Sequence, residues 1–212
     1  MNENRPVAVE GLPFIVPLLI LTAALWYFGA HYAAIFFLLL TAFVVWFFRN
    51  PERDIPSDEN SIVSPADGKV IVIGRVFDDR FLKTDALKIS IFMNVFNVHV
   101  NRIPTSGKVL GVFYNPGKFF SADKDKASLE NEQNALLIEA KNGKKFVVNQ
   151  IAGLIARRIV CYAKPGDSIE KGRRFGMIRF GSRLDVYLPT DCKIDVNVGD
   201  KVKAGSSILA HW

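Results

Sequence analysis

The stretch around Gly181 and Ser182 is the part of this 212-residue chain with the clearest potential for chemistry. A serine hydroxyl that follows glycine can attack the glycine carbonyl carbon, because no Cβ obstructs the approach. Such an attack replaces an amide bond with an ester and opens a route to cleavage of the chain. An ordinary turn between two strands is the alternative for any Gly-Ser pair. Apolar neighbours favour a site from which water is excluded: Met177, Ile178, Phe180 and Leu184.

The attacking hydroxyl needs a proton acceptor, and a histidine oriented by a carboxylate is the usual arrangement. Of the three histidines, His31 lies in an apolar segment and His211 is the penultimate residue. His99 lies in an alternating stretch and is the best candidate base, with a purely structural histidine as the alternative. The favoured acid is Asp67 in Ser-Pro-Ala-Asp-Gly, a sequence that by itself indicates only a turn.

A long apolar segment precedes these residues. Between Gly11 and Phe48 there is no Asp, Glu, Lys or Arg. A straight helix of that length would be about 57 Å long, whereas the hydrocarbon core of a bilayer is about 30 Å thick. The interruption at 29–31 therefore predicts a membrane-anchoring helical hairpin over residues 1–48, which either crosses the bilayer twice or enters it from one side. The segment is too long for a signal peptide and lacks the polar stripe of a soluble core hairpin.

The charge distribution points to a membrane surface. The chain carries 27 Lys and Arg against 21 Asp and Glu, and only Arg5 of the basic residues precedes residue 49. This excess favours an anionic leaflet, and no motif supports a nucleic-acid partner. Arg49 and Arg53 follow the second apolar stretch and predict a soluble domain on the cytoplasmic side of the cell membrane. Cys161 and Cys192 lack metal-ligand spacing, so we expect reduced structural thiols and no metal site.

The rest of the chain reads as β structure. Residues 49–60 form a polar, proline-bounded linker, and residues 61–212 contain no long amphipathic helix. We expect a mainly β domain, a barrel or a sandwich, with a hairpin turn at Asn142-Gly143 and a helical turn over 154–158. The predicted strands are 69–76, 88–91, 95–103, 108–114, 135–140, 145–151, 159–163, 184–188 and 193–198.

Two segments repeat one pattern. Residues 165–172 and 198–205 share Gly-Asp-x-apolar-x-x-Gly, which predicts two tight turns that each lead into a short strand. These turns resemble those of biotinyl- and lipoyl-type barrels, as does the segment 64–69. A non-enzymatic, membrane-tethered binding module of that kind is therefore one alternative. No lysine lies in the setting that a carrier lysine requires.

Several long motifs, in order, resemble the phosphatidylserine decarboxylase proenzymes of the short bacterial and archaeal type. The resemblance extends over nearly the whole chain beyond the linker. The matching pieces are residues 48–53, 64–68, 97–104, 131–134, 150–158 and 175–189.

The resemblance implies that the bond between Gly181 and Ser182 is cut without hydrolysis. Ser182 would become a pyruvoyl group, with no external cofactor and no metal. Residues 1–181 would form the β chain and residues 182–212 the α chain of a heterodimer. The sequence leaves any higher oligomeric state open.

The resemblance also implies a reaction. The amine of phosphatidylserine would form a Schiff base with the pyruvoyl group of Ser182, and loss of CO2 would give phosphatidylethanolamine. Asp67 matches the acid linked to self-processing, and His99 matches the first histidine of a His-x-x-His segment in longer members. Arg102 stands where the second histidine would be, so His99 could serve both steps or Asp67 could act more directly on Ser182.

Two further expectations concern the substrate. The lipid phosphate could be held by arginine side chains, for which the candidates are Arg102, Arg157 and Arg158. The same chemistry on the ether lipid archaetidylserine is the alternative reaction.

Overall fold

The computed structural model describes residues 5–117, 131–153, 159–179 and 182–212. The chain divides into two compact units, residues 1–52 and residues 53–212.

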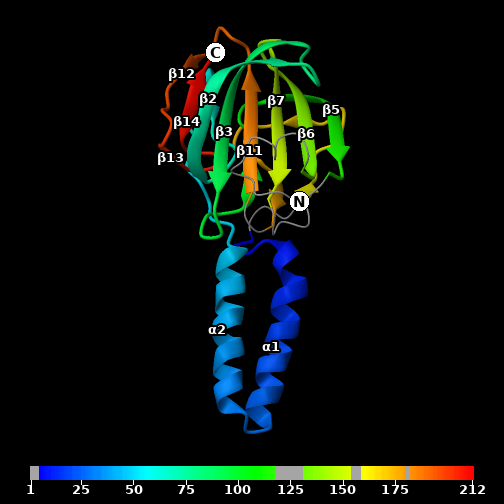
Figure 1. Cartoon of the computed structure of the whole chain (residues 1–212), viewed down its shortest axis with the longest axis vertical. Coiled ribbons are helices and arrows are strands. Elements are labelled where there is room, and N and C mark those ends of the chain that lie inside the picture. Colours follow the sequence, from blue (N-terminus) through cyan, green and yellow to red (C-terminus); the bar gives the residue numbers. More distant parts are fainter. Residues whose placement is uncertain (1–4, 118–130, 154–158, 180–181) are drawn as a thin grey trace. The chain divides into compact units, whose positions relative to one another are not determined.

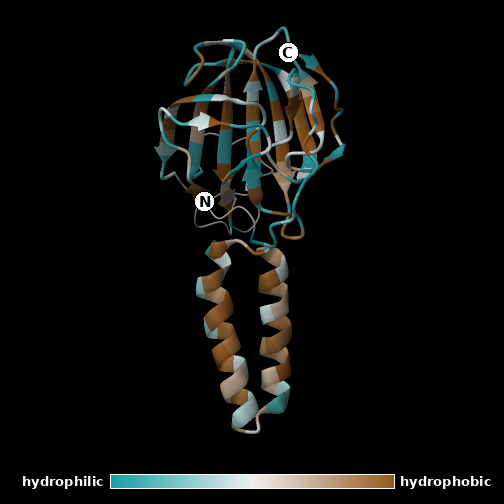
Figure 2. Ribbon diagram, turned by 180° about the vertical axis from the view of Figure 1, so that it is seen from behind, coloured by the Kyte–Doolittle hydropathy of each residue, from teal (hydrophilic) through white to brown (hydrophobic). Residues whose placement is uncertain are grey.

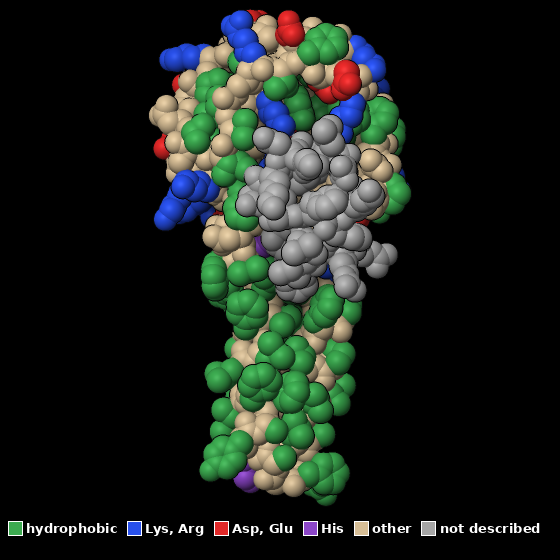
Figure 3. All heavy atoms as spheres, in the orientation of Figure 1, with side chains coloured by type: hydrophobic (Ala, Val, Ile, Leu, Met, Phe, Trp, Pro, Cys, Tyr) green, Lys and Arg blue, Asp and Glu red, His purple; other side chains and the backbone are tan. Residues whose placement is uncertain are grey.

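The first unit is a pair of apolar helices. A short 3-10 helix, Val9–Gly11, leads into α1 (Leu12–Tyr27), and α2 (His31–Phe47) follows after a turn at Gly29 with φ of +79°. Figure 2 shows both helices hydrophobic along nearly their whole length, and Figure 3 shows their surface covered with apolar side chains. The helix over Val9–Tyr27 is long and apolar enough to cross a membrane, by length and composition, and His31–Phe47 is slightly shorter.

The second unit is built from fourteen strands among the described residues (Figure 1). An eight-stranded sheet has the order β13-β2-β3-β11-β7-β6-β5-β9, and two three-stranded sheets have the orders β4-β10-β8 and β1-β14-β12. The fold is mainly β, as the sequence predicts. The strands are β1 (Ser61–Val63), β2 (Gly68–Asp78), β3 (Thr84–Met93), β4 (Val100–Arg102), β5 (Gly107–Asn115), β6 (Gln133–Ala140), β7 (Lys145–Ala152), β8 (Ile159–Cys161), β9 (Ser168–Ile169), β10 (Arg174–Ile178), β11 (Ser182–Leu188), β12 (Lys193–Ile194), β13 (Lys201–Val202) and β14 (Ile208–His211).

Strand β11 lies in the middle of the large sheet, antiparallel to β3 on one side and to β7 on the other. Its side chains alternate between two faces. Leu184, Val186 and Leu188 are fully buried in the main apolar core, whereas Tyr187 packs in a smaller cluster on the opposite face. Both faces of this strand are therefore covered, which explains its nearly continuous burial.

The two repeated turns adopt the same conformation. Gly166 and Gly199 have φ of +94° and +104°, and Gly172 and Gly205 have φ of +78° and +79°. These values lie in the left-handed region that glycine adopts without steric cost. The turns lead into β9 and β13, which form the two opposite edges of the large sheet. The pattern repeated in the sequence is therefore also repeated in the structure.

A second repeated pair, which the sequence analysis missed, extends this internal symmetry. Residues 65–70 and 104–109 share Pro-x-x-Gly-Lys-Val. They lead into β2 and β5, which lie next to the two edge strands. A Cβ on Gly68 or Gly107 would lie 2.3 or 2.2 Å from a carbonyl oxygen of the neighbouring strand, so both positions require glycine. The two halves of the sheet are therefore built on one pattern.

Some predicted strands were longer than the observed ones, and one of them, 193–198, contains only the two-residue strand β12. The alternating stretch 95–103 contains only the short strand β4, and the residues before it form a turn in which Asn94 N–H donates to Asn97 Oδ1 at 2.9 Å. Side-chain capping by asparagine competes here with strand pairing. The predicted hairpin turn at Asn142-Gly143 is confirmed, with Gly143 at φ +79°. The predicted helical turn at 154–158 lies outside the described residues.

The cysteines give a test of this packing. Both are free thiols, as expected, and burial raises the pKa of Cys192 to about 11 from an ordinary value of 9.0. At pH 8 we expect iodoacetamide to label Cys192 about 100-fold more slowly in the folded protein than in urea, because the thiolate is the nucleophile. Intact mass and peptide mapping measure the two rates. Equal labelling with and without urea would contradict the packing around this residue.

Candidate active site

Ser182 is the first residue of β11, and it is completely buried. It pairs with Met93 on β3 and with Ala152 on β7. Because Leu184 faces the main core, Ser182, two residues earlier on the strand, faces the same side. Its hydroxyl oxygen has no hydrogen-bond partner in the described structure. Gly181, the other half of the proposed cleavage site, lies outside the described residues.

His99 is also completely buried, directly before β4. Its Nδ1 atom lies 3.0 Å from the carbonyl oxygen of Asn97. A carbonyl can only accept, so Nδ1 carries a hydrogen, and in the neutral tautomer with this hydrogen Nε2 has the lone pair. The backbone N–H of Ile178, four residues before Ser182, donates to the His99 carbonyl at 3.4 Å. Strand β10 therefore connects the candidate base to the segment that leads to the candidate nucleophile.

Asp67 lies at the corner that precedes β2, and it is 9% exposed. The Nη2 atom of Arg53 donates to both carboxylate oxygens, at 2.8 and 3.0 Å. The backbone N–H of Ala204 donates to Oδ1 at 2.8 Å. The carboxylate is thus held by an arginine at the start of the second unit and by the turn before β14. The described contacts fix the orientation of Asp67 but do not include one to Ser182.

Of the three arginines proposed to bind the lipid phosphate, only Arg102 lies within the described residues. Arg102 is 6% exposed, and its Nη1 donates to the carbonyl of Gly172 at 2.8 Å. Its side chain also lies against Gly205, where a Cβ would be 2.8 Å from Arg102 Cδ. These contacts favour a structural role for this guanidinium in joining the two repeated turns. Arg157 and Arg158 lie outside the described residues.

A chain of hydrogen-bonded, buried amide side chains crosses the core next to the row of residues that contains Ser182. Gln150 Nε2 donates to Asn101 Oδ1 at 2.8 Å, and Asn134 Nδ2 donates to Gln150 Oε1 at 3.1 Å. Gln150 pairs with Leu184, so this chain lies next to the row of Ser182. Three motifs that are far apart in the sequence meet here through hydrogen bonds. In the low dielectric of the core these bonds are strong and fix the two sheets relative to each other.

The opposite face of β11 carries buried charge. Arg183 is 1% exposed, and its Nε and Nη2 donate to the two carboxylate oxygens of Asp185 at 2.7 and 2.8 Å. Lys88 Nζ on β3 lies 3.2 Å from the same carboxylate. A bidentate arginine pair of this kind is geometrically rigid. It fixes the first residues of β11 against β3.

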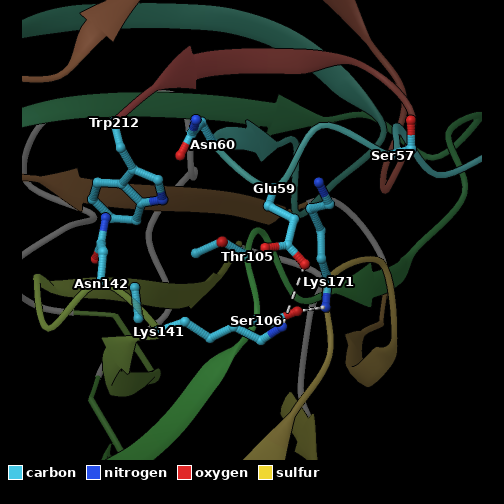
Figure 4. A pocket seen from close by; sticks show the side chains of 10 residues that line it. Ser57, Glu59, Asn60, Thr105, Ser106, Lys141, Asn142, Lys171 and Trp212 are labelled. Atoms are coloured by element: carbon cyan, nitrogen blue, oxygen red, sulfur yellow. Dashed lines mark hydrogen bonds and ion pairs between the residues drawn. The ribbon is translucent and has the colours of Figure 1, made fainter.

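A pocket of about 360 Å³ lies elsewhere, at the end of β6 (Figure 4). Glu59 and Lys141 form an ion pair of 3.6 Å at its wall. Strand β6 begins at Gln133, beside the row of Ser182, and ends at Ala140, in the pocket wall. Seven residues at about 3.4 Å each separate the two ends by roughly 24 Å. The pocket therefore does not contain the candidate nucleophile.

Internal symmetry explains where this pocket lies. Ser106 occupies the place in its repeat that Asp67 occupies in the other. Its hydroxyl accepts from the backbone N–H of Lys171 at 3.0 Å, as Asp67 accepts from Ala204 at 2.8 Å. The pocket is thus the counterpart of the Asp67 corner, with a hydroxyl in place of the carboxylate. Only one of the two related corners has kept an acid at this position.

Sequence reasoning missed Glu132, which precedes β6 and is 4% exposed. Its Oε1 accepts from the hydroxyl of Tyr114 at 3.0 Å and from the N–H of Ile159 at 3.3 Å. The residue belongs to the motif 131–134, but no pattern in the sequence distinguishes it from a surface glutamate. Only its burial in the structure does so.

Comparison with known proteins identifies the family of this chain. The profile of the family described as phosphatidylserine decarboxylase matches residues 40–210. The phosphatidylserine decarboxylase proenzyme of Geotalea uraniireducens is 53% identical over 208 residues, covering 98% of this chain and 97% of the relative. The proenzyme of Desulfotalea psychrophila is 53% identical over 211 residues, covering 100% and 99%. The profile match and the near-complete coverage of both sequences show that the chain belongs to the phosphatidylserine decarboxylase family.

Proposed function

We propose that this protein decarboxylates phosphatidylserine to phosphatidylethanolamine and CO2 after cutting itself between Gly181 and Ser182. The observation that carries the proposal is the fully buried Ser182 hydroxyl at the first residue of a central strand. Relatives of the protein in several bacteria carry the name phosphatidylserine decarboxylase proenzyme. A proenzyme is a precursor that requires processing, and this serine is the position at which we expect it.

The processing chemistry follows from the position of the hydroxyl. Ser182 Oγ attacks the carbonyl carbon of Gly181, and its proton goes to a base, for which we propose His99 through Nε2. The C–N bond between the two residues then breaks as the base passes this proton to the nitrogen of residue 182. The resulting ester is cleaved by elimination, in which the Cα–H proton of residue 182 is lost and the glycine carboxylate leaves. Addition of water and loss of ammonia then convert residue 182 into a pyruvoyl group. The burial of Ser182 keeps water from hydrolysing the ester first.

The residues around Ser182 fit a pyruvoyl group. The hydroxyl oxygen leaves with the glycine carboxylate, and it has no hydrogen-bond partner in the described structure, so its loss breaks no described bond. The ketone oxygen comes from water and replaces the nitrogen on Cα. The neighbours in its row, Met93 and Ala152, are completely buried. When formed, the group supplies a carbonyl that accepts the electron pair left by departing CO2. His99 is the residue that we expect to move a proton beside it.

The large sheet would hold the two pieces together after cleavage. The bond to be cut precedes β11, and every residue of β11 from Ser182 to Leu188 pairs with β3. Residues from Ser182 to Tyr187 also pair with β7. Cleavage and the loss of the nitrogen of residue 182 leave the pairing of residues 183–188 with the neighbouring strands in place. We expect the α chain, 182–212, to remain bound to the β chain as a heterodimer.

The apolar helices suit a lipid substrate. We propose that the helical hairpin anchors the protein in the cell membrane, with residues 53–212 on the cytoplasmic side. Arg49, whose guanidinium lies 3.9 Å from the centre of the Trp46 ring, provides a cation next to an aromatic residue at the end of α2. This pairing is typical of a membrane interface. The acyl chains of the substrate would then stay in the bilayer during the reaction.

Ser182→Ala tests the cleavage site. Without the hydroxyl we expect a single chain of 212 residues and no decarboxylation, whereas the unaltered protein gives two fragments with a blocked amino terminus at residue 182. Intact mass and a denaturing gel read the outcome. Ser206→Ala, in the other Gly-Ser pair, is the matched control and should cleave normally. A cut at the same bond in Ser182→Ala would refute the assignment.

His99→Ala tests the base. We expect cleavage to slow by about 10² or more, the contribution of a general base, as followed by the fraction cut over time on a gel. His31→Ala, at an exposed position on α2, is the control. Since His99 is buried, His99→Gln and a thermal melt should accompany the test. Normal cleavage together with normal decarboxylation in a folded His99 variant would exclude both proposed roles.

Asp67→Asn tests the acid. The amide keeps an oxygen for the Ala204 N–H but loses the ion pair with Arg53. We expect cleavage at least about tenfold slower, within the range of acid-base contributions. Asp54→Asn, at an exposed aspartate close by, is the control. Unchanged cleavage kinetics in Asp67→Asn would remove this residue from the processing step.

A further inference from the structure

Glu132 is buried, and one of its two carboxylate oxygens has no hydrogen-bond partner in the described structure. One carboxylate oxygen, Oε1, accepts hydrogen bonds from Tyr114 and Ile159. The other, Oε2, is buried without a hydrogen-bond partner, and the described structure contains no ion pair to this residue. A buried carboxylate oxygen without a donor is energetically costly. Its retention indicates a ligand that brings a donor.

The sheet register places Glu132 in the row of Ser182. Ser182 pairs with Ala152, and the N–H of Ala152 donates to the carbonyl of Glu132 at 2.9 Å. Residues opposite each other in a ladder point to the same face. Two strand spacings of about 4.8 Å put the Cα atoms of Glu132 and Ser182 roughly 10 Å apart.

Alanine is the only residue between them in this row. The Ala152 side chain ends at Cβ, so its own side chain adds little bulk between the carboxylate and the hydroxyl. Glu132 also contacts the second sheet, because Ile159 is the first residue of β8. Ile159 pairs with Ile178, whose N–H donates to the carbonyl of His99. Glu132 and His99 therefore lie on opposite flanks of the short sheet, next to the row of the serine.

We propose that Glu132 binds the protonated amino group of the lipid head group and so selects amine-bearing phospholipids. This inference rests on the proposed function, because it places the amine of the substrate beside residue 182. The ammonium offers three N–H donors and a positive charge, which match a carboxylate oxygen without a partner. The charges neutralise each other in the buried site. Glu132 thus acts in recognition, separately from cleavage of the chain.

Head-group binding to the full-length, self-cleaved protein in detergent tests the proposal. Isothermal titration calorimetry compares dihexanoyl phosphatidylethanolamine with dihexanoyl phosphatidylpropanol, which has a methyl group in place of the ammonium. The protein should bind the amine lipid at least tenfold more tightly, the effect of one charge-assisted hydrogen bond. In Glu132→Gln, which keeps an acceptor for Tyr114 and Ile159, this preference should fall below about twofold.

The controls separate this inference from the proposed function. Glu139→Gln, near the far end of the strand β6 that Glu132 precedes, should retain the preference. Glu132→Asp, which keeps the charge, should retain part of it. A Glu132→Gln protein that cleaves itself and still prefers the amine lipid tenfold overturns the inference, as does equal weakening of both lipids. Failure of the unaltered protein to cleave would instead contradict the proposed function.

Discussion

The pairing of β11 with β3 and β7 is the constraint on which the rest of the second unit depends. It sets the first residue of β11 at the edge of a closed core and fixes which way that residue faces. A shift of one position would turn Ser182 to the opposite face and bring Arg183 into the apolar core. The ion pair between Arg183 and Asp185 opposes that shift, because a lone guanidinium in the core would be strongly unfavourable. Register and buried charge thus specify the same arrangement.

Some polar side chains of the core are hydrogen-bonded to one another, and others contain atoms that have no hydrogen-bond partner in the described structure. The amides of Asn101, Gln150 and Asn134 satisfy one another and connect the sheets, which makes them part of the framework. The Ser182 hydroxyl and Glu132 Oε2, one row away, have no hydrogen-bond partner in the described structure. Hydrogen-bonded amides thus lie beside polar atoms that have no described hydrogen-bond partner. This arrangement is expected where a site is preorganised for chemistry or for a ligand.

The sequence predicted the fold class, the hairpin of apolar helices as a candidate anchor, and most strands, because periodicity and turn residues are local signals. It also identified Ser182, His99 and Asp67 as candidates, largely through the resemblance to a family. It overextended the strand at 95–103, since asparagine capping outweighs alternation there. Glu132 could not be predicted, because its role depends on register. A predictable hairpin sets Glu132 beside Ala152, but the pairing of β7 with β11, which brings Ser182 into the same row, joins strands that are not consecutive in the sequence.

The repeated turns and corners have an evolutionary consequence. Two halves with the same glycines, the same Pro-x-x-Gly-Lys-Val segment and equivalent hydrogen bonds are what duplication and fusion of a smaller gene would leave. An ancestor assembled from two identical copies would have had two equivalent corners. After fusion each corner could diverge by itself, and here one retains Asp67 while the other has Ser106 and an open pocket. The difference between Asp67 and Ser106 at two equivalent corners is what such divergence would produce.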